Sequence, residues 1–189
     1  MADINQTISK FYEVAQQRDF SRDFQYRILN ITSAGKSGHV FRISEEDLVY
    51  AKGGELPART ITNHTAPYMG LDFNVPGAAT YPGSMALTFY CDNQSTIRRL
   101  FENWSFATFN EETSSGDYYV PTPSSVLDMV QLDSQFQKVA QYQLVGVYPQ
   151  EVGALSYDIT GAGAPVEMSV TLQYHFWKRT SPTSIGIGG

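Results

Sequence analysis

The chain has 189 residues, of which 42% are hydrophobic, and it carries a formal net charge of −6. This length fits one domain, and the hydrophobic share is enough for a packed core, which excludes a wholly disordered chain. The acidic balance disfavours a protein that binds DNA or RNA tightly, because such proteins gain affinity by neutralising phosphates.

The first predicted elements are a helix over residues 3–17 and a strand over residues 23–31. Asp3 is a suitable N-cap for the helix. Alternation in the strand slips at Leu29, which a β-bulge would explain, and a turn is predicted over 33–38. One apolar face of the helix is predicted from residues at i, i+4, i+7 and i+8 spacing: Ile4, Ile8, Phe11, Tyr12 and Ala15.

Residues 39–83 read as the least regular part of the chain. Short strand-like pieces at 39–43, 59–63 and 71–75 are separated by an acidic cluster at 45–47, by glycines and by prolines. Connections this long without regular structure are uncommon in a compact domain and are often functional.

The second half is predicted to hold most of the sheet structure. A strand at 85–90 leads into a helix that Asp92 or Asn93 caps and that ends near Trp104. A polar loop at 110–125, strands at 126–132 and 139–148, a turn at 149–153 and a loop at 154–164 follow.

The last predicted strand, residues 166–177, alternates almost perfectly between apolar and polar side chains. Such a strand has one dry and one wet face, and it needs a sheet beside it and a second layer over it. The whole pattern predicts a mainly β fold: a β-sandwich or flattened barrel of two antiparallel sheets with one or two flanking α-helices. Residues 1–179 are expected to form a single domain, and residues 180–189 a flexible tail.

The sequence offers little for catalysis, so we expect no enzyme and no catalytic, cofactor-binding or metal site. Gly35-Lys36-Ser37 lacks the earlier glycine of a phosphate-binding loop, and the three histidines lack metal-ligand spacing. Cys91 reads as a buried small apolar residue. We find no signal-peptide pattern and no apolar run long enough to cross a bilayer, and therefore expect a soluble intracellular product without membrane insertion.

Three features in chain order resemble the tail tube proteins of contractile-tailed, myovirus-type phages and the related inner tube proteins of contractile injection systems. The first is Phe24-Gln-Tyr-Arg-Ile28 after a short helix. The second is a strand into Asp92 followed by an amphipathic helix. The third is the segment 142–158, with Val-Gly-Ala-Leu in it, followed by the alternating strand that ends at Trp177.

The resemblance implies a structural virion protein whose hexameric rings stack into a tube, the channel for DNA during ejection. It implies assembly in the host cytoplasm and a place in the phage tail. The implied partners are further copies of the chain, the tail sheath protein, the baseplate or tube initiator, the tail terminator, the tape measure protein and genomic DNA held without specific binding.

Two alternatives stay open. A tube-initiating baseplate protein or the inner tube of a contractile injection system would share the fold. A small-ligand-binding β-barrel, whose aromatic residues line a pocket, is the alternative of another class.

Two sets of residues are candidates for assembly contacts. We expect segment 44–70 and the N-terminal helix to reach a neighbouring ring, with contacts from Ile4, Ile8, Phe11, Tyr12, Glu45, Glu46, Asp47, Leu48, Tyr50 and Leu56. We expect the wet face of the last strand to line the lumen or meet another subunit, through Glu167, Ser169, Thr171, Gln173 and His175.

Overall fold

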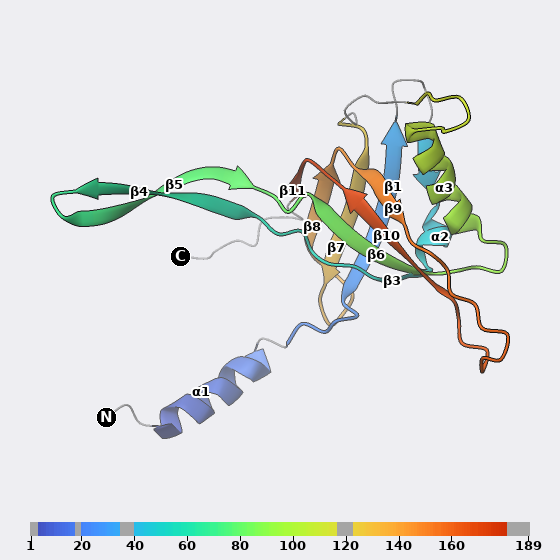
Figure 1. Ribbon diagram of the computed structural model, residues 1–189. Coiled ribbons are helices and arrows are strands. Elements are labelled where there is room, and N and C mark those ends of the chain that lie inside the picture. Colours follow the sequence, from blue (N-terminus) through green and yellow to red (C-terminus); the bar gives the residue numbers. More distant parts are fainter. Residues whose placement is uncertain (1–3, 18–19, 35–39, 117–122, 181–189) are drawn as a thin grey trace.

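The computed structural model describes residues 4–17, 20–34, 40–116 and 123–180 (Figure 1). Two antiparallel sheets face each other, while a two-stranded hairpin and the first helix extend away from them. The predicted class, a mainly β sandwich with few helices, is confirmed.

The larger sheet has five strands in the order β11-β8-β7-β1-β2. The register between β1 and β7 shifts between Ile28 and Asn30, so Leu29 is the extra residue of a bulge, as its broken alternation predicts. The strand extends to Ala34, beyond the predicted start of the turn, and residues 35–39 lie outside the described ranges. The strand bounds are β1 Tyr26–Ala34, β2 Val40–Ile43, β7 Val126–Leu132, β8 Lys138–Val145 and β11 Phe176–Thr180.

The smaller sheet has four strands in the order β3-β6-β10-β9. Its central pair, β6 and β10, is in register from Glu167 opposite Tyr90 to Gln173 opposite Ser84. The strand bounds are β3 Ala51–Gly53, β6 Ser84–Tyr90, β9 Tyr148–Val152 and β10 Glu167–Gln173.

The prediction of one continuous strand over 166–177 is wrong, because the chain changes sheets after Gln173. The Tyr174 N–H donates to the carbonyl of Gly83 at 2.8 Å, and the His175 N–H donates to the carbonyl of Val145 at 3.0 Å. These two bonds tie β10 to the smaller sheet and β11 to the larger one. The predicted tail, residues 180–189, lies outside the described ranges except for Thr180.

The predicted strand at 139–148 and turn at 149–153 are also wrong. Strand β8 ends at Val145, Gly146 adopts a φ of 74°, and the chain re-enters the other sheet as β9. A Cβ at Gly146 would collide with the imidazole ring of His175. Glycine is therefore required where the β8–β9 connection passes the β10–β11 connection.

Residues 39–83 are far more regular than predicted. After β2, Ser44 caps a short helix, α2 (Glu45–Leu48), by accepting a hydrogen bond from the Asp47 N–H at 3.1 Å. Beyond β3, the pieces predicted at 59–63 and 71–75 are parts of a long hairpin, β4 (Thr60–Tyr68) and β5 (Leu71–Thr80).

The two predicted longer helices are confirmed as α1 (Ile4–Gln17) and α3 (Thr96–Thr108). The N-cap of α3 is Ser95 rather than the predicted Asp92 or Asn93, and its side chain makes no cap bond. The Asp92 carboxylate nevertheless accepts hydrogen bonds from the Thr96 N–H at 2.7 Å and the Thr96 hydroxyl at 2.9 Å, at the first residue of the helix. Among the described helices, none has the length and apolar content needed to span a bilayer.

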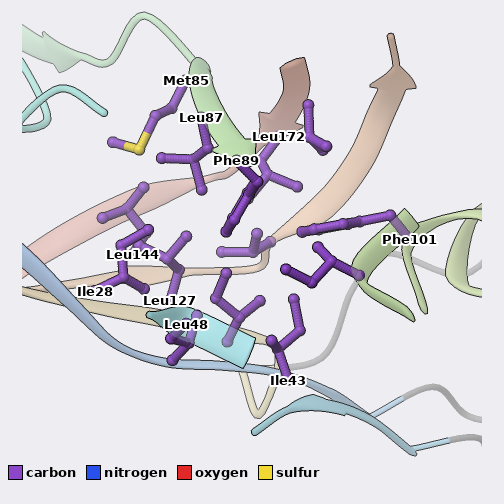
Figure 2. Packing of buried hydrophobic residues seen from close by; sticks show 14 of the residues in the cluster. Ile28, Ile43, Leu48, Met85, Leu87, Phe89, Phe101, Leu127, Leu144 and Leu172 are labelled. Carbon is purple, nitrogen blue, oxygen red and sulfur yellow. The ribbon is translucent and has the colours of Figure 1, made fainter. Parts of the chain in front are cut away.

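The core lies between the two sheets, and α3 closes one end of it (Figure 2). Phe101 of α3 reaches the ring of Phe89 at a centroid distance of 5.5 Å. Each fully buried side chain of this size contributes about 1.5 to 3 kcal/mol. Four even-numbered residues of the last segment face this core, as its alternation predicts: Met168, Val170, Leu172 and Tyr174.

Tyr26 provides a test of this packing. Its hydroxyl is buried, has no hydrogen-bond partner among the described residues, and would lie 2.5 Å from a Cβ placed on Gly54. Burial raises the pKa of this hydroxyl, so the group stays neutral.

We expect Tyr26→Phe to leave the free energy of unfolding unchanged or to raise it by up to about 1 to 3 kcal/mol, because it removes an unsatisfied buried group. Urea denaturation of both proteins measures the difference. A loss above about 1 kcal/mol would show that the hydroxyl makes a stabilising bond.

Candidate assembly surfaces

The described residues show no arrangement suited to metal chemistry: no three His, Cys, Asp or Glu side chains there are grouped to hold an ion. His64 lies on the hairpin and His175 at the crossing between sheets, while His39 and Gly35-Lys36-Ser37 fall outside the described ranges. Cys91 is half-buried, and this burial raises the pKa of its thiol, which makes it a poor nucleophile at neutral pH.

The β4–β5 hairpin projects from the sandwich as a two-stranded ribbon (Figure 1). Opposite residues of the ribbon share a face, and one face is apolar while the other carries Asn63, Thr65 and Asn74. Sequence reasoning missed this surface, although Leu71, Phe73 and Val75 already alternate. The largely apolar face comprises Ala66, Tyr68, Leu71, Phe73 and Val75, together with His64 opposite Val75.

This face is uncovered in the subunit. Tyr68, Leu71 and Phe73 are 66%, 65% and 50% exposed. A lone two-stranded hairpin is marginally stable in water, and contiguous exposed apolar surface marks an interaction site.

The base of the hairpin is fixed by Trp177 of β11. The indole N–H donates to the carbonyl of Ala58 at 2.9 Å, just before β4 begins. The same ring makes an edge contact with Tyr81, just after β5 ends, at a centroid distance of 6.4 Å. The hairpin therefore leaves the sandwich in a direction that the larger sheet determines.

Helix α1 is the second uncovered apolar surface. It lies apart from the sandwich in Figure 1, and Ile8, Phe11 and Tyr12 are each more than half exposed. Ile4 begins the helix, but its side chain is not among those described. Lys10 and Glu13 form an exposed ion pair with a 2.9 Å N–O distance.

In α2, the acidic residues lie at or near the surface, and only Leu48 lies in the core. Glu45 and Glu46 are exposed, whereas the carboxylate of Asp47 accepts a hydrogen bond from the Ser44 hydroxyl at 2.7 Å. Leu48, expected at an interface, is instead buried in the core, because α2 turns this side chain toward the sheets (Figure 2). Tyr50 and Leu56 are partly exposed, at 41% and 39%.

The outer face of the smaller sheet is small and polar. Glu167, Ser169, Thr171 and Gln173 lie on it together, opposite the core-facing residues of β10. His175 does not join them, since the chain has left this sheet by then, although its side chain is exposed. Gln173 donates to the side-chain oxygen of Gln150 on β9 at 2.6 Å.

This face carries one ion pair and a further exposed acidic residue, Glu151, opposite Thr171. Lys52 of β3 donates to the Glu167 carboxylate at 2.6 Å, and this bond raises the pKa of Lys52. Lys52 therefore stays charged at neutral pH, and its charge is paired with the Glu167 carboxylate at the centre of the face.

A pocket of about 480 Å³ opens where β1 begins and β7 ends, and sequence reasoning missed it. Phe24 and Phe136 are both 63% exposed, and their ring centroids are 6.3 Å apart. Leu48, Val49 and Val130 are among the other lining residues. We call this feature the Phe24–Phe136 pocket.

Comparison with known proteins identifies the family. Residues 15–180 match the family model described as phage tail tube protein. The chain belongs to the phage tail tube protein family. The resemblance of its three sequence features to tail tube proteins is thereby confirmed, whereas a search of curated proteins finds no match.

Solved structures support the same fold. A chain of the anti-feeding prophage tube-terminating cap is 9% identical, with a TM-score of 0.59 over 87% of this chain and 93% of that one. A chain of the anti-feeding prophage baseplate is 11% identical, with a TM-score of 0.57 over 86% and 97%. A chain of the PVC sheath-tube complex of an extracellular contractile injection system is 10% identical, with a TM-score of 0.55 over 90% and 97%.

Two substitutions test whether the hairpin face is uncovered in the subunit. We expect Phe73→Thr with Val75→Thr to change the free energy of unfolding by no more than about 0.5 kcal/mol and to reduce binding of a hydrophobic dye. Thermal unfolding and dye fluorescence of dilute protein measure both. As the matched control, Val170→Ala should destabilise the core by about 2 kcal/mol or more; an equal loss from the hairpin variant would show that its face is already buried.

Proposed function

We propose that this protein is the structural subunit of a phage tail tube, whose hexameric rings stack around a channel that DNA traverses during ejection. The observation that carries the proposal is the match of residues 15–180 to the tail tube family. The unit that assembles is the single domain of residues 1–179.

The uncovered surfaces of the subunit support self-association. The apolar hairpin face and the exposed apolar side chains of α1 are separate patches of different shape. A contact between different patches of identical chains is heterologous, and such contacts generate closed rings or open helical stacks. Repetition of one subunit can therefore build the whole tube.

The proposed contacts between rings and between subunits come from three regions. Helix α1 supplies apolar contacts, the hairpin supplies a projecting ribbon, and the surface around α2 supplies charge. The residues are Ile4, Ile8, Phe11, Tyr12, Glu45, Glu46, Asp47, Tyr50 and Leu56, with the apolar face of the hairpin added.

The proposed channel lining is the outer face of the smaller sheet. Ser169 and Thr171 are short and polar, and Glu167 is balanced by Lys52. DNA binds proteins mainly through positive charges that neutralise phosphates, and that binding is strong at low salt. A lining without free positive charge lets DNA pass without retaining it.

The proposed partners follow from a tube inside a contractile tail. They are the sheath protein, the baseplate or tube initiator, the terminator, the tape measure protein and DNA without specific binding. The protein would be assembled in the host cytoplasm, act in the virion, need no cofactor and catalyse no reaction.

The second candidate is a tube-initiating baseplate protein or the inner tube of a contractile injection system. One similar chain comes from a baseplate structure, and another from the sheath-tube complex of an injection system. Isolation of the native particle distinguishes these roles: a tube subunit is present in many copies along the tail, an initiator only at its end.

Electron microscopy of the purified protein tests the proposed function. Because the apolar hairpin and helix are uncovered in the subunit, we expect rings or hollow filaments whose amount rises with protein concentration. Sedimentation quantifies the assembled fraction. Monomers that persist at high concentration, without rings or filaments, would contradict the proposal.

The position of the channel lining has its own test. In a Cys91→Ser background, Ser169→Cys should react in assembled tubes with a small maleimide but not with a maleimide attached to a large protein, because the channel excludes the larger reagent. In dilute subunits both reagents should react, which serves as the control. Equal labelling of tubes by both reagents would place this face on the outside.

A further inference from the structure

Two residues combine backbone strain with exposed apolar bulk. Phe136 has a φ of 58° and Met69 has a φ of 50°, the left-handed region that side chains other than Gly, Asn and Asp seldom adopt. Met69 is 86% exposed at the hairpin turn, and Phe136 is 63% exposed at the mouth of the Phe24–Phe136 pocket.

Neither position uses the residue that its backbone favours. A tight hairpin turn with positive φ at its first central residue normally holds Asn, Asp or Gly there, whereas this one holds Met69 before Gly70. Strained residues of this kind persist at functional sites. Exposed apolar residues on such backbones are therefore candidates for a contact with another molecule.

The Phe24–Phe136 pocket and the hairpin tip carry charges of opposite sign. Arg27 and Lys138 line the pocket. Asp72 is the only Asp, Glu, Lys or Arg between residues 60 and 80, directly after the hairpin turn. Within the described ranges, the ion pairs involve neither these two basic residues nor Asp72.

We propose that the hairpin tip of one copy inserts into the Phe24–Phe136 pocket of a second copy. Met69 and Leu71 pack against the paired rings of Phe24 and Phe136 inside the pocket, and Asp72 faces Lys138 and Arg27 at the rim. This inference rests on the proposed function, since it specifies one contact through which the tube would assemble. The tip cannot fill the pocket of its own chain, because the hairpin projects away from the sandwich (Figure 1).

The size of the pocket favours the hairpin over helix α1 as the occupant. A helix with its side chains is about 10 to 12 Å wide, and the apolar residues of α1 are spread along 14 residues. The hairpin tip instead presents Met69 and Leu71 within a stretch of three residues. The charged pair of α1, Lys10 with Glu13, is also already satisfied within the helix.

A charge exchange between the tip and the rim tests the inference. We expect Asp72→Arg and Lys138→Glu each to raise the protein concentration needed for assembly about tenfold, because each places like charges together. The double variant, Asp72→Arg with Lys138→Glu, should return to within about threefold of the unmodified protein. Sedimentation of a concentration series measures all four proteins, after circular dichroism has shown that each is folded.

The matched control pairs Asp72→Arg with Lys178→Glu, a lysine of β11 outside the pocket lining. This combination should assemble no better than Asp72→Arg alone. Restoration by Lys178→Glu to the same extent would overturn the specific pairing, as would a Lys138→Glu double variant no better than its parents.

The substitution Met69→Asn distinguishes the effect of backbone strain on stability from the effect of the tip contact on assembly. Asn suits the left-handed backbone, so the melting temperature of the dilute subunit should stay level or rise, while assembly weakens about tenfold or more. Unchanged assembly by Met69→Asn would overturn the insertion even though the unmodified protein forms tubes. An unmodified protein that never assembles would overturn both this inference and the proposed function.

Discussion

The apolar inner faces of the two sheets can be buried only against each other, and every other feature of the subunit depends on that contact. Leu87 and Phe89 from one sheet meet Leu127 and Leu144 from the other (Figure 2). The chain passes from the smaller sheet to the larger one at Tyr174 and His175, and the His175 ring lies against Gly146. Trp177 lies in β11, the strand that follows this crossing, and its indole N–H holds the base of the hairpin by a hydrogen bond to Ala58. The ribbon and α1 remain outside the core, and their apolar faces are exposed among the described residues.

Much of the fold could be predicted because alternation and caps are local signals. The two helices, the bulge at Leu29 and the core-facing side of β10 all follow from spacing in the sequence. The sheet crossing after Gln173 could not be predicted, since Tyr174 and Phe176 continue the alternation. Only the hydrogen bonds to Gly83 and Val145, which are distant in sequence, show that the partner strand changes.

The assembly surfaces were harder to predict because exposure is a property of the folded chain. The apolar residues of the hairpin were expected only as short strand-like pieces of an irregular segment, and the acidic cluster near α2 as part of the connection between them. Leu48 was expected at an interface but lies in the core, while Met69 and Phe136 drew no notice. Their distinguishing property, an apolar side chain on a left-handed backbone, is visible only in the backbone dihedral angles.

The central claim is that apolar surfaces left bare by the subunit are covered by other copies of the chain. Hydrogen exchange of the hairpin amides, compared between dilute subunits and concentrated protein, tests it most directly. The account predicts fast exchange at residues 60–80 in dilute protein and strong protection after assembly, while core strands such as β10 stay protected throughout. Exchange in the hairpin that is independent of protein concentration would contradict the account.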